Sequence, residues 1–249
     1  MSGVVQAKLI GGFGNQIHQY AAVRKYAESI GASLEVPDWV GKTIFNLTEP
    51  GWSRELPEVN DGGCGCPPEV RWGEMNIRLG GYFQSQRWVS LLSRTELRRW
   101  LRVDADLAET CRGVLPAGPY TAAHVRQGDY IGHPLYANVL ERSYTRACIE
   151  HGLSIDEWVW QDSPRRVEGL HDRFHFLPDF LVLMHASILL RANSTFSWWA
   201  AALGDGVVYA PVVEAKVGAV DADFVKGNWP RCADTSRTGP HVEDLHLPP

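Results

Sequence analysis

The stretch Val5-Gln6-Ala7-Lys8-Leu9-Ile10-Gly11-Gly12-Phe13-Gly14-Asn15-Gln16 decides the fold of the first part of this chain. Apolar and polar residues alternate over Val5–Leu9, and this period of two predicts a strand. A glycine turn follows at once, and a helix with one apolar face is expected over Asn15–Ile30, with Gly31 as its C-cap. Leu34–Val36 is then typical of a second strand. A strand, turn, helix and strand in this order predict an α/β fold.

The middle of the chain is less regular. Residues 48–69 are rich in Pro, Gly, Asn and Asp and predict a long loop. Helical sequence returns over Trp88–Leu107, and Pro116–Pro119 has the composition of a linker. This linker predicts two domains, residues 1–117 and residues 118–249.

A second α/β pattern follows the linker. Its expected elements are a buried strand at Tyr120–Val125, a helix at Tyr144–His151, a strand at Trp158–Trp160, an apolar helix at Pro178–Leu190, a short buried helix at Phe196–Leu203 and a strand at Val207–Ala210 ended by Pro211. The polar, proline-bearing tail beyond Asp234 is expected to be loosely held.

Composition excludes several classes of protein. Hydrophobic residues make up 45% and charged residues 21% of the 249 residues, which is ordinary for a globular protein. A net charge of -5 without a block of like charge argues against nucleic acid as a partner. No run is long enough to span a bilayer, and the start does not resemble a signal peptide. The five scattered cysteines suit free thiols in the cytosol, and Cys64-Gly65-Cys66 lacks zinc-site spacing.

The glycine turn has a functional and a structural interpretation. Glycines at a strand-to-helix turn let the backbone approach an anion, and the following helix start offers free N–H groups. Asn15 can bind a ligand there or cap the helix. The spacing Gly-Gly-x-Gly differs from the dinucleotide fingerprint, so a tight turn capped by Asn15 remains the alternative.

A second cluster, His124–Tyr130, lies at the end of the expected strand Tyr120–Val125. Ligands of α/β sheets bind at the carboxyl ends of strands. His124 and Arg126 point to the same side of an extended chain, and Arg126 suits bidentate binding of a phosphate. Asp129 can orient Arg126 or contact a sugar hydroxyl. The alternative is an ordinary Arg–Asp ion pair.

The third cluster is Asn193–Trp199, in which small hydroxyl residues precede a short apolar helix. Ser194 or Thr195 can cap this helix, and the same N-terminus can hold a diphosphate. Trp198 and Trp199 are expected to be core residues, because aromatic residues between a helix and a sheet are usually buried.

Together these segments resemble a known family. Gly11–Gln16 with Gln19-Tyr20-Ala21, His124–Tyr130 and Asn193–Trp199 resemble three motifs of the bacterial α-1,2-fucosyltransferases, glycosyltransferase family 11. Gly81–Ser85 is similar to a further segment of that family. The motifs follow the family's order and span residues 7 to 211.

The resemblance implies a GT-B-like α/β fold with two Rossmann-like halves facing a cleft. Residues 1–117 would form the acceptor-side domain and residues 118–249 the nucleotide-sugar-binding domain. The implied enzyme is an inverting, metal-independent glycosyltransferase without a cofactor. It transfers fucose from GDP-fucose to a sugar hydroxyl of a glycan or surface polysaccharide in α-1,2 linkage. The alternatives are a transferase for another nucleotide sugar and a non-catalytic nucleotide- or glycan-binding relative.

The implied partners are a GDP-sugar donor and a glycan acceptor, and nucleic acid is not expected. The implied location is the cytoplasm, and peripheral association with the inner face of the membrane is left open, as is the oligomeric state.

The resemblance also assigns roles to residues. Arg126 would neutralise the β-phosphate of departing GDP, and Asn15 would lie near the reacting centre. Apart from the resemblance, Asp129 is the candidate general base if it faces the acceptor and a partner of Arg126 if it does not. Asp162, after the strand Trp158–Trp160, would contact the nucleoside. The remaining expected donor-binding residues are Gly12, Gly14, Gln16, His124, Asn193, Ser194, Thr195 and Phe196.

Two positions depart from the family pattern. Gln127 replaces the usual second arginine of the motif, so one positive charge is missing. His18 replaces the usual phenylalanine in the first helix, where it is a candidate acceptor contact or base, or a structural residue.

Overall fold

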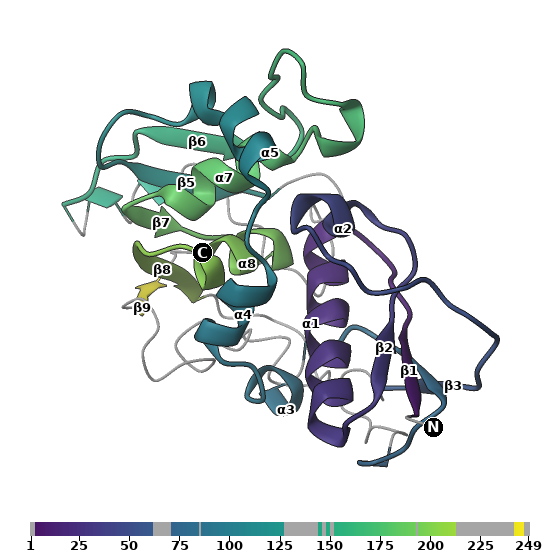
Figure 1. The fold of residues 1–249 in the computed structure, drawn as a ribbon. Coiled ribbons are helices and arrows are strands. Elements are labelled where there is room, and N and C mark those ends of the chain that lie inside the picture. The colour runs from purple at the N-terminus through teal and green to yellow at the C-terminus, as the bar shows by residue number, and fades with distance from the viewer. Residues whose placement is uncertain are drawn as a thin grey trace. The chain divides into compact units, whose positions relative to one another are not determined.

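The structure is a computed structural model that describes residues 3–61, 71–84, 86–126, 144–145, 148–149, 152–192, 194–212 and 242–246. The chain forms two compact units, Met1–Asp104 and Ala105–Pro249, which we call unit 1 and unit 2. Each unit contains its own sheet (Figure 1). All strand pairs in the described residues are parallel, which confirms the α/β class. The assignment of functions to residues 1–117 and 118–249 stays a prediction.

Sheet A of unit 1 has the order β2-β1-β4-β3. Its strands are β1 (Val4–Ala7), β2 (Ser33–Glu35), β3 (Glu58–Asn60) and β4 (Ile77–Gly80). Helix α1 (Phe13–Ile30) connects β1 to β2 and packs against both strands. Gly31 ends α1 with φ of 68°, so the predicted glycine C-cap is confirmed.

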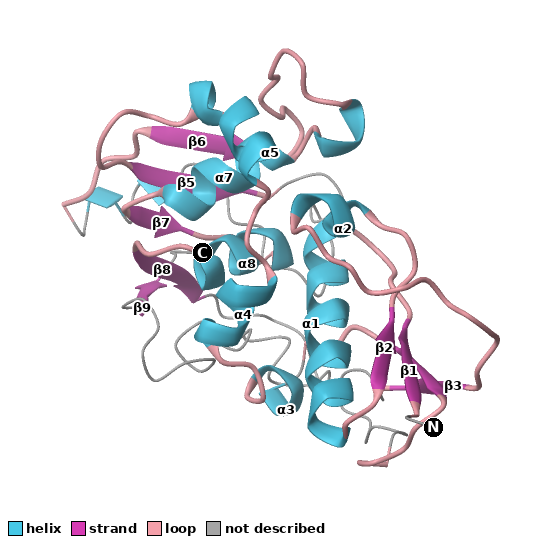
Figure 2. Ribbon diagram, in the orientation of Figure 1, coloured by secondary structure: helices cyan, strands magenta, loops and turns pink. Residues whose placement is uncertain are grey.

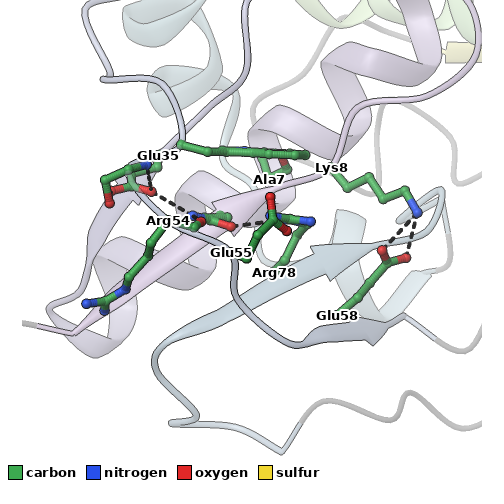
Figure 3. A network of polar contacts seen from close by, with 10 residues as sticks. Ala7, Lys8, Glu35, Arg54, Glu55, Glu58 and Arg78 are labelled. Carbon is green, nitrogen blue, oxygen red and sulfur yellow. Dashed lines mark hydrogen bonds and ion pairs between the residues drawn. The ribbon is translucent and has the colours of Figure 1, made fainter.

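The segment after residue 50 is held against sheet A by a polar network (Figure 3). The buried Gln6 of β1 donates its Nε2 hydrogens to Glu35 Oε2 and to the Arg54 carbonyl, both at 2.8 Å. Arg78 Nε of β4 donates to Gln6 Oε1 at 3.1 Å, and the Arg78 guanidinium stacks on Trp52. The predicted loop 48–69 contains strand β3, which forms by pairing with β4. The sequence did not indicate this strand because it is too short to show periodicity.

The remaining helices of unit 1 are short. The helical sequence expected over Trp88–Leu107 forms three short helices, α3 (Gln86–Val89), α4 (Arg94–Trp100) and, in unit 2, α5 (Ala105–Thr110). Ser93 and Glu96 form a capping box that starts α4 as a separate helix. Helix α2 (Val40–Ile44) follows β2, and the turn η1 (Arg112–Val114) follows α5.

Sheet B of unit 2 has the order β6-β5-β7-β8-β9. Its strands are β5 (Thr121–Val125), β6 (Glu157–Trp160), β7 (Ile188–Leu190), β8 (Val207–Val212) and β9 (Val242–His246). The turn η3 (Asp172–Phe174) precedes helix α7 (Leu177–His185), and α8 (Thr195–Leu203) connects β7 to β8 along the chain. Figure 2 distinguishes the helices of this unit from its strands by colour. Trp198 and Trp199 are completely buried, as predicted.

Three predictions for unit 2 are wrong in whole or in part. The apolar run expected as one helix is helix α7 followed by strand β7, because periodicity does not distinguish a buried helix from a buried strand. Strand β8 does not end at Pro211 but continues to Val212, where β9 pairs with it. Pro211 lies beyond the last pair with β7, Leu190↔Tyr209, so the β7 ladder does not need the N–H that proline lacks. The tail contributes β9 rather than being loosely held throughout.

Candidate functional site

The carboxyl ends of β5, β6 and β7 bring most of the unit 2 candidates to one edge of sheet B, because the three strands are parallel neighbours. His124 and Arg126 lie at the end of β5, and Asp162 lies in the turn after β6. Ser194 follows β7. Asp129 and Asn193 lie outside the described residues, so their roles stay predictions.

His124 is an uncharged polar group at this edge. Its side chain is buried, and its ring packs on Phe196 with 5.6 Å between the ring centroids. Tyr144 donates its hydroxyl hydrogen to the His124 carbonyl at 3.0 Å. Burial, aided by the charge of Arg126, lowers the pKa of His124 to about 3. The imidazole is therefore neutral at physiological pH, and its Nδ1 has no hydrogen-bond partner among the described residues.

Arg126 is the first residue after β5 and is partly buried. Its positive charge adds to burial in lowering the pKa of His124. That the two side chains point to the same side stays a prediction. The rest of the motif, 127–130, lies outside the described residues.

The start of α8 combines a polar cap with an apolar contact. Ser194 is the N-cap, and its Oγ accepts a hydrogen bond from the Phe196 N–H at 3.3 Å. Of the two capping candidates, Ser194 therefore fills the role, and Thr195 is the first residue of the helix. The N-terminal N–H groups and dipole of such a helix attract anions.

Arg191 is a cationic residue at this edge that the sequence reasoning missed. Its side chain is 1% exposed, and its backbone N–H donates to the Tyr209 carbonyl at 3.0 Å. Ala123 pairs with Leu190, so Arg191, the first residue after β7, lies level with His124, the penultimate residue of β5. Its charge opposes the burial that raises the pKa of Tyr144. The available signal was a charged residue directly after the apolar run 188–190 and two residues before the candidate motif that starts at Asn193.

Arg165, in the segment after β6, forms ion pairs with two carboxylates. Arg165 Nη1 lies 2.6 Å from Asp179 Oδ1, and its Nη2 lies 2.7 Å from Glu157 Oε2. These ion pairs tie the segment after β6 to helix α7 and to β6. The exposed Asp162 lies in the same segment, in a turn closed by the Ser163 N–H and the Trp160 carbonyl.

The glycine turn of unit 1 is held by its own side chains. Gly11 has φ of 77°, and its carbonyl accepts from Gln16 Nε2 at 3.1 Å. Gly12 is the N-cap of α1, so the helix begins at Phe13 and Asn15 does not cap it. Asn15 Oδ1 instead accepts from Gln84 Nε2 at 2.9 Å, which joins the turn to the segment after β4. Gly14 is buried in the first turn of the helix.

His18 lies in the buried face of α1. It is 1% exposed, and burial lowers its pKa to about 3. Its burial and its low pKa favour a structural role for His18 over a role as an acceptor contact or a base.

Within the described residues, no three His, Cys, Asp or Glu side chains form a group able to hold a metal ion. Likewise, no helix in the described part of the chain has the length and apolar character needed to cross a membrane.

Neither a known protein-family model nor a curated protein sequence matches this chain. Solved structures do. The fucosyltransferase NodZ from Bradyrhizobium is 14% identical, with a TM-score of 0.52 over 82% of this chain and 94% of that chain. A NodZ α-1,6-fucosyltransferase co-crystallised with GDP is 15% identical, with a TM-score of 0.51 over 82% and 93% of the two chains. This likeness concerns the fold, and it confirms a GT-B-like α/β architecture with two Rossmann-like halves.

Proposed function

We propose that this protein is a glycosyltransferase of the fucosyltransferase type and that the carboxyl edge of sheet B binds the diphosphate of its GDP-sugar donor. The observation that carries the proposal is the placement of Arg126 after β5 and of Arg191 and the N-terminus of α8 after the neighbouring β7, where Phe196 contacts the neutral His124. Three sources of positive potential at one sheet edge suit a diphosphate.

The donor is GDP-fucose in this proposal. Two independent lines support it: the three sequence motifs resemble those of fucosyltransferases, and fucosyltransferase structures share the fold. One of those structures was co-crystallised with GDP. The α-1,2 linkage rests on the motifs alone, since the NodZ structure with GDP belongs to an α-1,6-fucosyltransferase.

The proposed reaction inverts the anomeric carbon. An acceptor hydroxyl attacks this carbon while the bond to the β-phosphate oxygen of GDP breaks through an oxocarbenium-like transition state. Negative charge grows on the leaving diphosphate, and stabilising it is the main catalytic work. Arg126 neutralises the β-phosphate, while the α8 N-terminus and its neighbours Thr195 and Phe196 line the diphosphate.

The other residues have supporting roles in the proposal. Arg191 supplies the positive charge that Gln127 does not. The buried His124 shapes the wall beside Arg126, and Asp162 contacts the nucleoside. Asp129 as general base, Asn193 as donor ligand and the donor contacts of Gly12, Gly14, Asn15 and Gln16 stay predictions.

Isothermal titration of the full chain with GDP, GMP and UDP tests the donor site. We expect GDP to bind more tightly than GMP, because the β-phosphate adds charge-assisted hydrogen bonds, and more tightly than UDP if guanine is recognised. Absence of GDP binding would overturn the proposal. A second assay measures GDP release from GDP-fucose and GDP-mannose with a panel of free sugars. GDP binding without release of GDP from either donor would favour a non-catalytic nucleotide-binding protein.

A further inference from the structure

We propose that the carboxyl edge of sheet A carries a carbohydrate subsite formed by Ile10 and Tyr82, with the linked carboxamides of Asn15 and Gln84 beside them. The proposal deepens the proposed function, because it names neutral sugar rings as the acceptor class that unit 1 holds. Ile10 follows β1 and Tyr82 follows β4, and these strands are neighbours. The subsite therefore draws on two adjacent strand ends, the usual place for ligands of parallel sheets.

The backbone of Ile10 is fixed by a single side chain. The Ile10 N–H donates to Gln19 Oε1 at 2.7 Å, and Gln19 Nε2 donates to the Ile10 carbonyl at 3.1 Å. Gln19 is completely buried in α1. Its carboxamide therefore satisfies the backbone N–H and carbonyl of Ile10 beyond the end of β1, as a neighbouring strand would. The Ile10 side chain nevertheless remains 37% exposed. The chain is thus held in a way that presents an apolar group to solvent.

Tyr82 is presented by a strained turn. Phe83 has φ of 53°, a conformation that non-glycine residues rarely adopt. The buried Asp61 carboxylate stabilises it by accepting the Phe83 N–H at 2.6 Å, and the Phe83 ring packs edge-on against Trp88. Gly81 has φ of 129°, and a Cβ there would overlap Asp61 Oδ1.

The consequence of this turn is the exposure of one aromatic ring. Tyr82 is 48% exposed, while the next residue, Phe83, is 1% exposed. Strain that surrounding contacts maintain is concentrated at functional sites. An exposed tyrosine ring on such a support offers a flat apolar face with a polar tip, which matches the apolar face and hydroxyl rim of a pyranose ring.

The neighbouring polar groups are amides. Gln84 Nε2 donates to Asn15 Oδ1 at 2.9 Å, which fixes both side chains beside the turn. A carboxamide carries both a donor and an acceptor, as a sugar hydroxyl does. The nearby charges are engaged elsewhere: Asp61 holds Phe83, and Lys8 lies 2.8 Å from Glu58. In the described part of this edge, aromatic, aliphatic and amide groups lie without a dedicated cation, which favours a neutral sugar over a phosphate.

Saturation-transfer NMR on the full chain with lactose, cellobiose, maltose and sucrose at millimolar concentration tests the subsite. We expect transfer to at least one disaccharide, its loss in Tyr82→Ala and its retention in Tyr82→Phe, which keeps the ring. The matched control is Trp72→Ala. Trp72 is 50% exposed in the segment before β4, at the opposite end of that strand, and should not affect transfer. Thermal unfolding of each variant reports whether the fold is retained.

Two results would overturn the subsite: no transfer to any of the four sugars in a protein that binds GDP, or equal transfer in wild type and a folded Tyr82→Ala variant. Failure of the proposed function looks different. In that case GDP does not bind, whereas the disaccharide signal and its dependence on the Tyr82 ring persist.

Discussion

The carboxyl edges of the two sheets differ in charge. At sheet B, Arg126 and Arg191 lie with the N-terminus of α8, and His124 is held neutral by burial. At sheet A, the residues after β1 and β4 present Ile10, Tyr82 and carboxamides. The same parallel architecture thus offers one edge suited to an anion and one suited to a neutral ligand. The difference teaches that the chemistry of each edge comes from a few residues after the strands rather than from the sheet.

Charged residues in sheet A serve a different purpose. Glu35 accepts hydrogen bonds from Ser53 and Gln6, and Arg78 lies 2.9 Å from Glu55 (Figure 3). Burial raises the pKa of Glu35, but the hydrogen bonds from Ser53 and Gln6 outweigh it, so the pKa lies below its ordinary value. These charges stabilise the fold of unit 1, whereas those of sheet B belong to the proposed diphosphate site.

The largest expected effect is on turnover in Arg126→Ala. Removing the main positive charge from the leaving diphosphate should reduce turnover on the order of a hundredfold or more. The measurement is GDP release from GDP-fucose with a transferring acceptor. The control is Arg112→Ala, an exposed arginine in η1, before β5. Near-normal transfer by Arg126→Ala would contradict the assignment of the diphosphate site to the carboxyl edge of sheet B.

Glu35→Ala should act on stability alone. It leaves the Gln6 carboxamide and the Ser53 N–H without their acceptor, and we expect the free energy of unfolding to fall by about 2–3 kcal/mol. Urea unfolding measures the loss, and titration with GDP should give an unchanged affinity. Glu28→Ala, which removes a half-exposed helix pair with Arg24, is the control and should cost under about 0.5 kcal/mol. A selective loss of GDP binding in Glu35→Ala would contradict the structural role.

The buried histidines predict that stability falls in mild acid. His18 and His124 each have a pKa of about 3 in the folded protein, well below the ordinary 6.5. The unfolded chain therefore binds protons first as pH falls below about 6.5, and stability decreases down to about pH 3. Each histidine should cost about 2 kcal/mol at pH 5 relative to neutral pH.

Urea unfolding at pH 7 and pH 5 measures this loss, and His18→Phe should remove about half of the part due to the two histidines. An unchanged pH dependence in a folded His18→Phe variant would show that His18 does not cause it.

Arg191→Met should weaken GDP binding by about tenfold, the loss of one charge-assisted hydrogen bond, with a smaller effect on GMP. Arg191→Lys should recover part of the GDP affinity because it retains the charge. Titration calorimetry with GDP and GMP measures the ratio of the two affinities, and thermal unfolding shows whether the variants are folded. If the ratio of GDP to GMP affinity stays at the wild-type value, Arg191 has no role at the diphosphate.

The smallest effect is expected at the Lys8–Glu58 pair, whose side chains are 40% and 35% exposed. Lys8→Met should lower the free energy of unfolding by less than about 1 kcal/mol, because exposed ion pairs are screened by solvent. Urea unfolding at low and high salt measures this cost, which should shrink as salt rises. A cost that is large and independent of salt would show that Lys8 has a role beyond this pair.

Local signals were sufficient for much of the fold and part of the site. Alternation, the glycine turn and Gly31 placed β1, α1 and β2 to within about two residues, since each signal acts over a few neighbouring residues. The placing of His124 and Arg126 at the end of a strand followed from the same patterns, whereas Ser194 was expected to follow a helix and instead follows strand β7.

Long-range contacts decided the rest. The segment 188–190 is a strand because β5 and β8 flank it, and the sequence alone favoured a helix. Strand β9 exists through pairing with β8, from a distant part of the chain. Arg191 reaches the edge of sheet B through that same placement of β7. The exposure of Tyr82 depends on Asp61, whose carboxylate stabilises the turn from another strand end. Sequence determined the residue types and the local turns, whereas tertiary structure decided which of them meet, because strand partners and burial arise between residues far apart in the chain.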